Sequence, residues 1–417
     1  MTASNPRIFL SAGEASGDQY GAELIAEVRR RLPEATFFGL GGTRMAEAGL
    51  ERVVKAEDVA VMGITEVILH MPQIYREFRR LVGALKAGRP DVAVLIDFPD
   101  VNFRLARELK KLGVPVLYFV SPQLWAWKRR RLRWVQERVD RMMVIFPFEE
   151  SFYRARGVDA EFVGHPLAEL ALPASLRDEY ARRHGLRLLI EGPASNRKKE
   201  WIALLPGSRW KEVRLNLPTM IEAAELLGSG YEFLLPIAST LDRKEVQELV
   251  DELSDGSTPQ ITLVGDAREA LFHARGSVVA SGTATVQAAV IGNPFVVVYR
   301  VSNMTYRVAK RLVRYPAEIP AQEDAAGNLP VGMVNLIAGR RVVPELLQDR
   351  FTGKNVAETL APLLADGPER SEMIAGLAQV RAKLLPALEG DGRRTAIQRV
   401  AEAVEELFVG VSSAVAG

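Results

Sequence analysis

Residues Val92–Phe103 read VAVLIDFPDVNF, and this stretch decides the fold. Its first half, Val92–Ile96, is a short apolar run rich in β-branched residues, which is typical of a strand buried on both faces of a parallel sheet. The run ends at Asp97, and Pro99 and Asp100 follow. Ligands of open α/β sheets bind beyond the carboxyl ends of the strands, so Asp97 is a candidate site residue. Because Asp is also a preferred helix N-cap, a capping role for Asp97 explains the local pattern equally well.

The composition predicts a two-domain globular protein. The chain has 417 residues, of which 48% are hydrophobic and 25% charged, and this length exceeds one ordinary core. A formal net charge of +2 gives no global reason to expect a nucleic-acid partner. The absence of cysteine excludes disulfides, zinc thiolates and cysteine nucleophiles. The first residues do not resemble a signal peptide, so we expect a cytoplasmic protein, with peripheral membrane contact left open.

Other predicted strands also run into glycine-rich turns. The strand Arg7–Leu10 is followed by Gly13 and Gly17, and the strand Thr36–Leu40 is followed by Gly41 and another glycine. Such turns after successive strands predict a doubly wound α/β sheet. The first turn suits phosphate binding at a helix N-terminus, but the glycines alone favour a tight turn that packs a helix on the sheet.

The second half of the chain repeats the α/β rhythm. It restarts with the strand Trp201–Leu205 and the turn Pro206–Arg209, and later the strand Ser277–Ala280 leads into SGTATVQAA (Ser281–Ala289). Small hydroxyl residues and a glycine at a helix start suit phosphate oxygens. An ordinary Ser/Thr N-cap with nothing bound explains the same pattern.

Three further segments of the second half have distinct compositions. Gly276–Tyr299 is free of charge and long enough to raise the question of a membrane span, but its polar, Gly and Pro residues favour a strand, turn, helix and strand. Pro316–Gly332 is rich in Pro, Gly and Ala and is predicted to be loop. From Val342 to the end the pattern is helical, with no further strand expected.

Aromatic and basic residues gather in three segments. Ser121–Trp134 contains three of the five tryptophans and five basic residues, which suits a membrane interface or an acidic, partly apolar ligand. Single-stranded nucleic acid would use the same pairing, but the chain lacks a recognised RNA-binding signature. The helix predicted from Val61 to about Leu85 is apolar first and basic later, which is typical of an interfacial helix or of one buried between neighbours. Four basic residues share one face of another predicted helix: Arg307, Lys310, Arg311 and Arg314. This stripe is either solvated or meets phosphates or anionic lipid.

Ten stretches of the chain together resemble the family of lipid-A-disaccharide synthases, in the order of that family and over nearly the whole length. They are SAGEASGD (Ser11–Asp18), VMGITEV (Val61–Val67), IDFPDVNFRLA (Ile96–Ala106), YFVSPQLWAWK (Tyr118–Lys128), FPFEESFY (Phe146–Tyr153), FVGHPL (Phe162–Leu167), LLPGSR (Leu204–Arg209), ASGTATVQAA (Ala280–Ala289), YRVSNMTYRVAKRLV (Tyr299–Val313) and NLIAGRRVVPELLQ (Asn335–Gln348).

The resemblance implies an α/β fold of two Rossmann-like domains facing a central cleft, the glycosyltransferase B-type fold, followed by an all-helical C-terminal segment. We expect residues 1–170 to form an acceptor-binding, membrane-facing domain and residues 200–367 to form the UDP-sugar donor domain. Terminal helices at about 368–410 are expected to pack back on the first domain or on a partner subunit, in a swapped homodimer.

The implied reaction is an inverting glycosyl transfer in lipid A biosynthesis. UDP-2,3-diacylglucosamine and 2,3-diacylglucosamine 1-phosphate (lipid X) would give lipid A disaccharide 1-phosphate, with a new β-1,6 linkage, and UDP. Both substrates are acylated, so peripheral contact with the inner membrane follows. No metal, cofactor or nucleic acid is expected.

The resemblance also implies the roles of particular residues. Asp97 corresponds to the general base and Arg209 to an arginine needed for activity, while Asp100 is expected to cap the helix or orient the loop. The residues expected to bind the UDP-sugar are Gly13, Glu14, Ser16, Gly17, Ser208, Ser281, Gly282, Thr283, Thr285 and Gln287. The residues expected on the acceptor and membrane surface are Met62, Trp125, Trp127, Arg129, Arg307, Lys310 and Arg311. Gln287 stands where the family usually has Glu, which keeps an acceptor oxygen but loses the charge.

Two other functions fit parts of the same pattern. A UDP-sugar epimerase, or a glycosyltransferase acting on another lipid-linked acceptor, would use the same turns. A nucleotide-sugar-binding or membrane-surface protein without catalysis is the alternative of a different class. The aromatic and basic segment and the apolar helix near Ile64 favour an acylated substrate, and Asp97 together with Arg209 favours catalysis.

Overall fold

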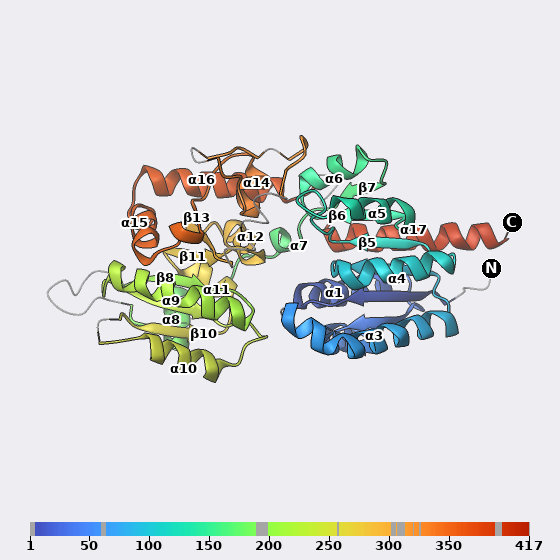
Figure 1. Ribbon diagram of the computed structural model, residues 1–417, viewed down its shortest axis with the longest axis horizontal. Coiled ribbons are helices and arrows are strands. Elements are labelled where there is room, and N and C mark those ends of the chain that lie inside the picture. The colour runs from blue at the N-terminus through green and yellow to red at the C-terminus, as the bar shows by residue number, and fades with distance from the viewer. Residues whose placement is uncertain are drawn as a thin grey trace. The chain divides into compact units, whose positions relative to one another are not determined.

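The described residues of the computed structural model form two compact α/β units (Figure 1). The structure describes residues 5–59, 64–188, 199–256, 258–301, 306, 313–319, 321–324, 327–387 and 394–416, without the side chains of 64–71 and 411–416. The first unit consists of Met1–Glu169, Arg314–Glu318 and Leu384–Gly417, and the second of Leu170–Val313 and Ile319–Lys383.

The first unit is built on a seven-stranded parallel sheet, with the strand order β3-β2-β1-β4-β5-β6-β7. The strands are β1 (Arg7–Ala12), β2 (Thr36–Gly41), β3 (Leu50–Lys55), β4 (Val92–Ile96), β5 (Val116–Phe119), β6 (Arg141–Val144) and β7 (Ala160–Phe162). All five residues of β4 are buried, as its apolar sequence predicts. Ile8 of β1 pairs with Val92, and Ile96 pairs with Phe119 of β5, so Asp97 lies at the carboxyl edge of the sheet between two strand neighbours.

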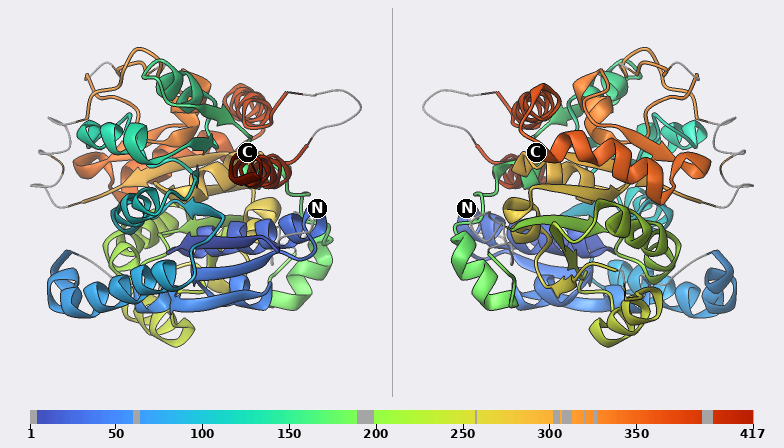
Figure 2. Two further views of the ribbon diagram at one scale, coloured as in Figure 1. Left: turned by 90° about the vertical axis from the view of Figure 1, so that its right-hand side faces the viewer. Right: turned by 90° about the vertical axis from the view of Figure 1, so that its left-hand side faces the viewer.

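Helices cover both faces of this sheet. They are α1 (Ala15–Arg31), α2 (Thr43–Glu47), α3 (Ile64–Ala87), α4 (Pro99–Lys111), α5 (Leu132–Arg138), α6 (Pro147–Arg154), α7 (Pro166–Glu169) and α17 (Ala396–Ala416). The C-terminal helix α17 packs beside α1 and against β4 and β5 (Figures 1 and 2). Its apolar face, which includes Val400 and Val404, is part of the same core as Leu10 and Ile96.

The second unit is built on a six-stranded parallel sheet, with the strand order β10-β9-β8-β11-β12-β13. The strands are β8 (Glu200–Leu205), β9 (Tyr231–Pro236), β10 (Ile261–Val264), β11 (Gly276–Ala280), β12 (Phe295–Tyr299) and β13 (Glu345–Leu347). The helices are α8 (Arg177–His184), α9 (Trp210–Leu227), α10 (Arg243–Leu253), α11 (Ala267–His273), α12 (Thr283–Ile291), α14 (Met333–Ala338), α15 (Gly353–Leu364) and α16 (Pro368–Lys383). The predicted fold class is therefore confirmed, and the charge-free segment Gly276–Tyr299 is β11, α12 and β12 rather than a membrane span.

The structure differs from the sequence-based expectation at the sheet edges and at one terminal helix. Two short strands were not predicted, β3 and β13, and both lie at the outer edge of their sheet. Exposed residues weaken the apolar signal of β3, and β13 has only three residues and begins with Glu345. The helices at about 368–410 were expected to pack on the first domain or on a partner subunit. Only α17 does so, because α16 packs on α12 and α14 of the second unit.

Residues Arg314–Glu318, which open the predicted loop Pro316–Gly332, pack with the first unit although the chain on both sides of them belongs to the second. Glu318 accepts a 2.9 Å hydrogen bond from Arg156, and the ring of Tyr315 lies 5.7 Å from the ring of Trp125. The carbonyl of Arg314 accepts a hydrogen bond from Arg129. The described parts of the loop contain no helix or strand before α14 begins at Met333.

Candidate active site

Asp97 lies in a strained turn between β4 and α4. Asp97 and Phe98 both have left-handed backbone conformations, with φ angles of 46° and 48°, which non-glycine residues rarely adopt because of steric strain. The amide of Asp97 donates a 2.9 Å hydrogen bond to the carbonyl of Phe119 on β5. Consecutive residues of this kind persist only where the surrounding structure holds them, and such strain is concentrated at functional sites.

Three buried side chains hold this turn. Asn102, which is fully buried on α4, donates from Nδ2 to the carbonyls of Asp97 at 2.7 Å and Ile96 at 3.2 Å. Its Oδ1 accepts a 2.6 Å hydrogen bond from Ser11 of β1. The hydroxyl of Tyr118 on β5 donates to the carbonyl of Asp97 at 2.6 Å. The position of Asp97 is therefore fixed from β1, β5 and α4 together.

Gly13 is required by the same turn. A Cβ atom at Gly13 would lie 2.5 Å from ring atoms of Phe98, so only glycine lets this ring approach the turn between β1 and α1. Gly17 has a milder constraint, because a Cβ there would lie 3.3 Å from Ala12 and 3.6 Å from Ile96. At Gly13 and Gly17 the structure therefore supports a packing role, one of the two roles that the sequence allowed for this turn.

The surroundings of Asp97 make its carboxyl a stronger base than an ordinary aspartate. Burial, and secondarily the nearby carboxylate of Glu14, raises the pKa of Asp97 to about 6. The N-cap residue of α4 is Phe98, and no side chain caps this helix start. The capping role considered for Asp97 is therefore excluded. With a pKa of about 6, the carboxyl of Asp97 is mostly ionised at neutral pH and binds a proton more tightly than a solvated aspartate does.

Asp100 lies in a different environment. It is exposed in the first turn of α4, and its Oδ1 is 2.5 Å from Nη2 of Arg131, in the turn that follows the loop after β5. Asp100 does not occupy the N-cap position, so of the two roles expected for it, orienting the loop fits this ion pair and capping does not.

The remaining residues of SAGEASGD are local to the first unit. Glu14 is the N-cap residue of α1, and Ser16 lies in its first turn. Asp18 accepts hydrogen bonds from the amides of Gly42, Arg44 and Met45 at 2.7–3.1 Å, which stabilises the start of α2. Gly13, Glu14, Ser16 and Gly17, expected to bind the UDP-sugar, therefore belong to the same unit as Asp97 and not to the unit of Ser208 and Ser281.

The tryptophans near Arg129 separate into buried and exposed residues. Trp125 was expected on a surface, but it is only 1% exposed, and its Nε1 donates a 3.0 Å hydrogen bond to Glu149. Trp127 is 49% exposed and lies under the Lys128 ammonium, 4.2 Å from the ring centre. The surface prediction is therefore wrong for Trp125, because a carboxyl 24 residues away gives its indole N–H a buried partner.

In the second unit, the turn Pro206–Arg209 follows β8 and leads into α9. Arg209 is the N-cap residue, with a side chain that is 68% exposed, and its Nη1 lies 3.6 Å from Oε1 of Glu212. The other oxygen of Glu212 accepts from the amides of Ser208 at 3.1 Å and Arg209 at 3.3 Å. Two amides at this helix start therefore already face a carboxylate, a group with the charge of a phosphate.

The second candidate anion site is the start of α12, after β11. The amide of Ser281 donates to Val298, and both the amide and the hydroxyl of Thr285 donate to the carbonyl of Gly282. Thr285 is fully buried, so its hydroxyl serves the turn and not a ligand. Gly282 and Thr283 remain at the exposed helix start, and Gln287 lies partly exposed one turn later. Because β8 and β11 are neighbours, both candidate anion sites lie on the carboxyl edge of one sheet.

Some predicted residues are outside the described part of the chain. These are Met62, Arg307, Lys310 and Arg311. Within the described ranges, no group of three or more His, Cys, Asp and Glu residues has an arrangement that could hold a metal ion.

Sequence reasoning missed Asn102, Tyr118, Glu149 and Glu212. Asn102 and Tyr118 lie within two of the stretches that carry the family resemblance. In the sequence, each is marked only by a polar side chain on an otherwise apolar face. Glu212, three residues after Arg209, was detectable as a capping-box position. Glu149 has the same N3 spacing in α6.

Sequence comparison relates the chain to one family over almost its whole length. The family model described as lipid-A-disaccharide synthetase matches residues 8–388. The lipid-A-disaccharide synthase of Acidobacterium capsulatum is 53% identical over 416 residues, covering 97% of each chain. That of Koribacter versatilis is 48% identical over 399 residues, covering 95% of this chain and 97% of the relative.

Solved structures share the fold at low sequence identity. An S. aureus MnaA–UDP co-structure matches with a TM-score of 0.61 at 11% identity and covers 97% of both chains. The glycotransferase of kitacinnamycin matches with a TM-score of 0.59 at 15% identity, covering 97% of this chain and all of that one. These likenesses place both units within the two-domain glycosyltransferase B-type fold.

Proposed function

The chain belongs to the lipid-A-disaccharide synthetase family, and we propose on this premise that Asp97 is the general base of its reaction and that Arg209 helps to stabilise the departing UDP. The chain is a hexosyltransferase of lipid A disaccharide synthesis. Its substrates are a UDP-sugar and a sugar phosphate, which we specify as UDP-2,3-diacylglucosamine and 2,3-diacylglucosamine 1-phosphate. Membership of this family removes the support for a UDP-sugar epimerase and for a binding protein without catalysis.

The reaction we propose is a single displacement. The 6-hydroxyl oxygen of the acceptor attacks C1 of the donor sugar while the bond from C1 to the UDP oxygen breaks. The hydroxyl proton passes to the carboxylate of Asp97, and the bonding electrons leave with UDP. One displacement inverts the configuration at C1, which gives the β-1,6 linkage from an α-linked donor.

The observation that supports Asp97 most strongly is its environment in the strained turn. A general base works best with a pKa close to the operating pH. Burial and Glu14 bring the pKa of Asp97 to about 6, so the carboxylate is mostly ionised at pH 7 and still binds a proton more tightly than a solvated aspartate. The hydrogen bonds from Asn102 and Tyr118 hold its backbone without neutralising its carboxylate.

The leaving diphosphate needs positive charge and N–H donors that are already in place. Arg209 supplies an exposed guanidinium, and the amides of Ser208, Gly282 and Thr283 lie at two helix starts. We propose that the diphosphate displaces the Glu212 carboxylate from the amides of Ser208 and Arg209. On this proposal the second unit is the donor domain and the first unit the acceptor domain.

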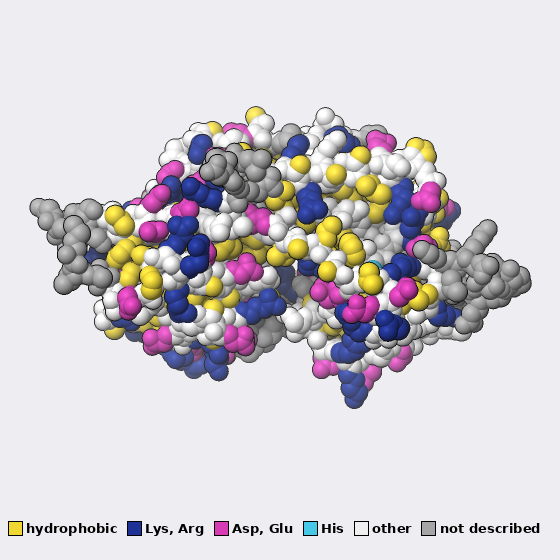
Figure 3. Space-filling model, turned by 180° about the vertical axis from the view of Figure 1, so that it is seen from behind, with side chains coloured by type: hydrophobic (Ala, Val, Ile, Leu, Met, Phe, Trp, Pro, Cys, Tyr) yellow, Lys and Arg dark blue, Asp and Glu magenta, His cyan; other side chains and the backbone are white. Residues whose placement is uncertain are grey.

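The proposed contact with the inner membrane is supported by the side chains exposed on α3. The outer face of α3 exposes Tyr75 and a cluster of arginines, Arg76, Arg79 and Arg80, and aromatic and basic groups together suit an anionic lipid surface. Basic and acidic side chains are interspersed on the face of the molecule in Figure 3. Among the described helices, none has the length and apolar character to cross a membrane.

The swapped homodimer remains a prediction from the family resemblance. In this structure α17 packs on α1 of its own chain, where Arg31 pairs with Glu402 at 2.7 Å and with Glu405 at 3.3 Å. Exchange of the C-terminal helix between subunits would form the same contacts across two chains. Light scattering of the purified protein tests this prediction, which requires a mass of about twice the 46.0 kDa of one chain.

The proposed reaction is tested by incubating the purified protein with UDP-diacylglucosamine and lipid X in detergent micelles. We expect UDP and a disaccharide 1-phosphate in equal amounts, with neither formed when one substrate is omitted. A folded sample that releases no UDP with these substrates, or releases it without the disaccharide, would contradict the proposal.

A further inference from the structure

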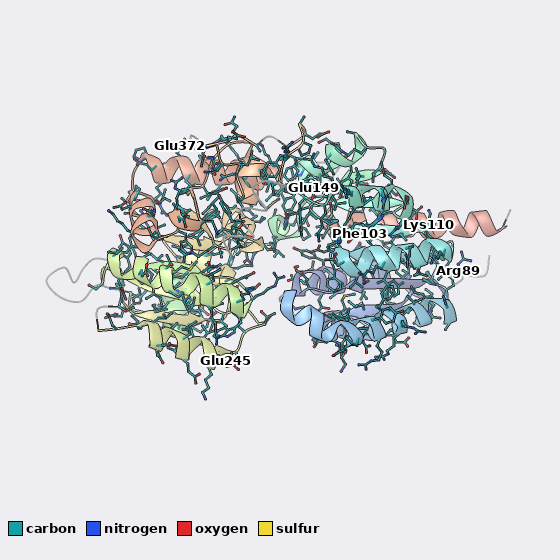
Figure 4. The ribbon with its side chains drawn as sticks, in the orientation of Figure 1. Arg89, Phe103, Lys110, Glu149, Glu245 and Glu372 are labelled. Atoms are coloured by element: carbon teal, nitrogen blue, oxygen red, sulfur yellow. The ribbon has the colours of Figure 1, made fainter. Side chains whose placement is uncertain are left out.

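One fully buried carboxyl group of the first unit has no part in the reaction just described. Glu149, labelled in Figure 4 near the start of α6, is 0% exposed. Its Oε1 accepts a 3.0 Å hydrogen bond from Nε1 of Trp125, and its Oε2 accepts from the amide of Phe146 at 3.2 Å. Ser121, whose hydroxyl is hydrogen-bonded to Tyr153 at 2.7 Å, also lies beside this carboxyl. Among the described residues, no lysine, arginine or histidine forms an ion pair with this carboxyl.

These partners show which segment Glu149 holds. Ser121 and Trp125 belong to the loop Ser121–Lys128, which follows β5. The loop begins after Val120, a β-branched residue at a φ angle of 63°, which is a strained conformation. Its middle is buried, while Trp127 and Lys128 at its end are exposed and stack on each other. The loop therefore has a buried anchor at Trp125 and an exposed end two residues later.

The same loop is tied to the turn that contains Asp97. Strands β4 and β5 are neighbours, so the loop and Asp97 leave the same edge of the sheet. Beyond the loop, Arg131 pairs with Asp100, three residues after Asp97. The loop thus lies between a buried attachment at Glu149 and an exposed attachment at the first turn of α4.

The structure assigns to Glu149 the role of a positioning residue: through Trp125 it fixes the loop Ser121–Lys128, whose exposed end, Trp127 and Lys128, contacts the acylated acceptor. This inference rests on the proposed function, because it takes the acceptor to bind beside Asp97. An amphipathic sugar phosphate suits an exposed tryptophan next to an ammonium group.

The protonation state of Glu149 provides a readout that a purely structural residue lacks. Burial raises the pKa of Glu149 to about 8, against the lowering effect of the hydrogen bonds that it accepts from Trp125 and Phe146. The titratable groups around it are Tyr153 of α6, which hydrogen-bonds to Ser121, and His165, which packs on Phe146. Burial raises the pKa of Tyr153 and lowers the pKa of His165 to about 3, so both are uncharged at neutral pH, and the ring of Tyr315 packs on Trp125. The carboxyl is therefore protonated at pH 7 and ionises at mildly alkaline pH.

Two substitutions test the role from both sides of the hydrogen bond. Trp125→Phe keeps an aromatic ring but removes the N–H donor, and Glu149→Gln keeps one acceptor oxygen but replaces the other with an NH2 group. We expect each to raise the KM for lipid X about three- to tenfold, with kcat and the KM for the UDP-sugar within about twofold of wild type. Glu150→Gln is the matched control, because it makes the same change on the next residue of α6, where the carboxylate pairs with Arg154 at the surface, and it should behave as wild type.

The dependence on pH separates positioning from mere loss of packing. An ionised carboxylate accepts a stronger hydrogen bond from Trp125 than a neutral carboxyl does. In wild type and Glu150→Gln, the KM for lipid X should therefore fall above pH 8, and in Glu149→Gln it should not. The indole N–H signal of Trp125 in an NMR spectrum, identified by its loss in Trp125→Phe, should shift with a midpoint near pH 8 in wild type and stay constant in Glu149→Gln. This second measurement needs no substrate.

The outcomes distinguish the two proposals. Wild-type protein that makes no disaccharide refutes the proposed reaction, and the NMR titration then still decides whether Glu149 controls the environment of Trp125. An unchanged KM for lipid X in both variants, an equal rise in the KM for both substrates, or a Trp125 signal that titrates identically in Glu149→Gln overturns the role assigned to Glu149. If Glu149→Gln does not fold, Trp125→Phe carries the kinetic test alone.

Discussion

The two strand-to-helix turns proposed to act in the reaction are built in opposite ways. The turn at Asp97 is strained and is held by buried partners on three elements, with Asn102 and Tyr118 donating to the Asp97 carbonyl. The turn at Arg209 is exposed, and its amides are hydrogen-bonded to Glu212, a residue of the same helix. One turn is fixed by the core, while the other is completed by an exposed side chain of its own helix.

This difference matches the tasks that we propose for the two turns. A general base must be in place before the reaction and must lie within hydrogen-bond distance of one proton. A diphosphate has many acceptor oxygens and must both enter and leave, so an exposed site with an arginine and the carboxylate that we propose it displaces suits it. The comparison predicts that substitutions around Asp97 impair catalysis or folding, whereas substitutions around Arg209 impair UDP binding and departure without affecting the fold.

The largest effect is expected at Asp97. Asp97→Asn removes the base and keeps the shape of the side chain, and Asn tolerates the left-handed backbone. We expect kcat to fall by about 10²–10⁴, measured as disaccharide formed at saturating substrates. Asp100→Asn is the control: it removes only an exposed ion pair, worth about 0.2–1 kcal/mol, and should keep kcat within about tenfold. Reversed effects of the two substitutions would transfer the role of base to Asp100.

The next effect is expected at Arg209. Arg209→Ala should lower kcat/KM by about 10²–10³, the usual loss when one donor to a developing negative charge is removed. Arg209→Lys should recover part of the loss, because lysine keeps the charge without the planar fork of donors. Arg214→Ala, which removes an exposed arginine from the next turn of α9, is the matched control. Arg209→Ala with normal turnover and normal UDP affinity by calorimetry would leave the donor site without its proposed cation.

A smaller effect is expected at Asn102, and Asn293 of the second unit provides a comparison. Asn102→Ala leaves buried carbonyls without their donor, which costs about 1–3 kcal/mol of unfolding free energy, measured by urea titration. Asn293 of the second unit has the same type of bond, from Ser277 to its Oδ1 at 2.5 Å, and Asn293→Ala should cost a similar amount. Only Asn102→Ala should also lower kcat, because only Asn102 holds the base. Equal losses of kcat in the two variants would mean that the loss reflects stability alone.

The smallest effect is expected at Gln287 in the donor unit. Glutamine keeps an acceptor oxygen for a donor-sugar or ribose hydroxyl but lacks the charge of the Glu usual in the family. Gln287→Glu should tighten UDP binding by less than tenfold in a calorimetric titration. A gain above tenfold would show that the donor site of this chain is impaired by the glutamine.

The interior of both sheets could be predicted from the sequence, and their edges could not. The runs at Val92–Ile96 and Phe295–Tyr299 are apolar because both faces of these strands are covered, so the strand signal is strong. Strands β3 and β13 lie at sheet edges: β3 mixes exposed with buried residues, and β13 has only three residues, the first of which is Glu345. The sequence of α16 contains no feature that indicates which of the two units this helix packs on.

The sequence predicted which positions form the candidate site, but not the backbone conformation, burial and hydrogen bonds of the residues there. The position of Asp97 followed from the end of a strand, while its left-handed backbone and raised pKa depend on Asn102, Tyr118 and Glu14, which the fold brings from three other elements. Trp125 was misplaced for the same reason: beside several arginines it has the sequence signature of a surface residue, and only the distant Glu149 explains its burial.

The pH dependence of kcat/KM tests the role of Asp97 most directly. As a base with a pKa of about 6, Asp97 should give an acidic limb, with activity rising through pH 6 to a plateau near pH 7. The phosphate of the acceptor also titrates in this range, so the decisive comparison is with Glu14→Gln, which removes the carboxylate that helps to raise the pKa of Asp97. The account predicts that the limb moves to lower pH in Glu14→Gln and disappears from the residual activity of Asp97→Asn. An acidic limb at the same pH in all three proteins would contradict it.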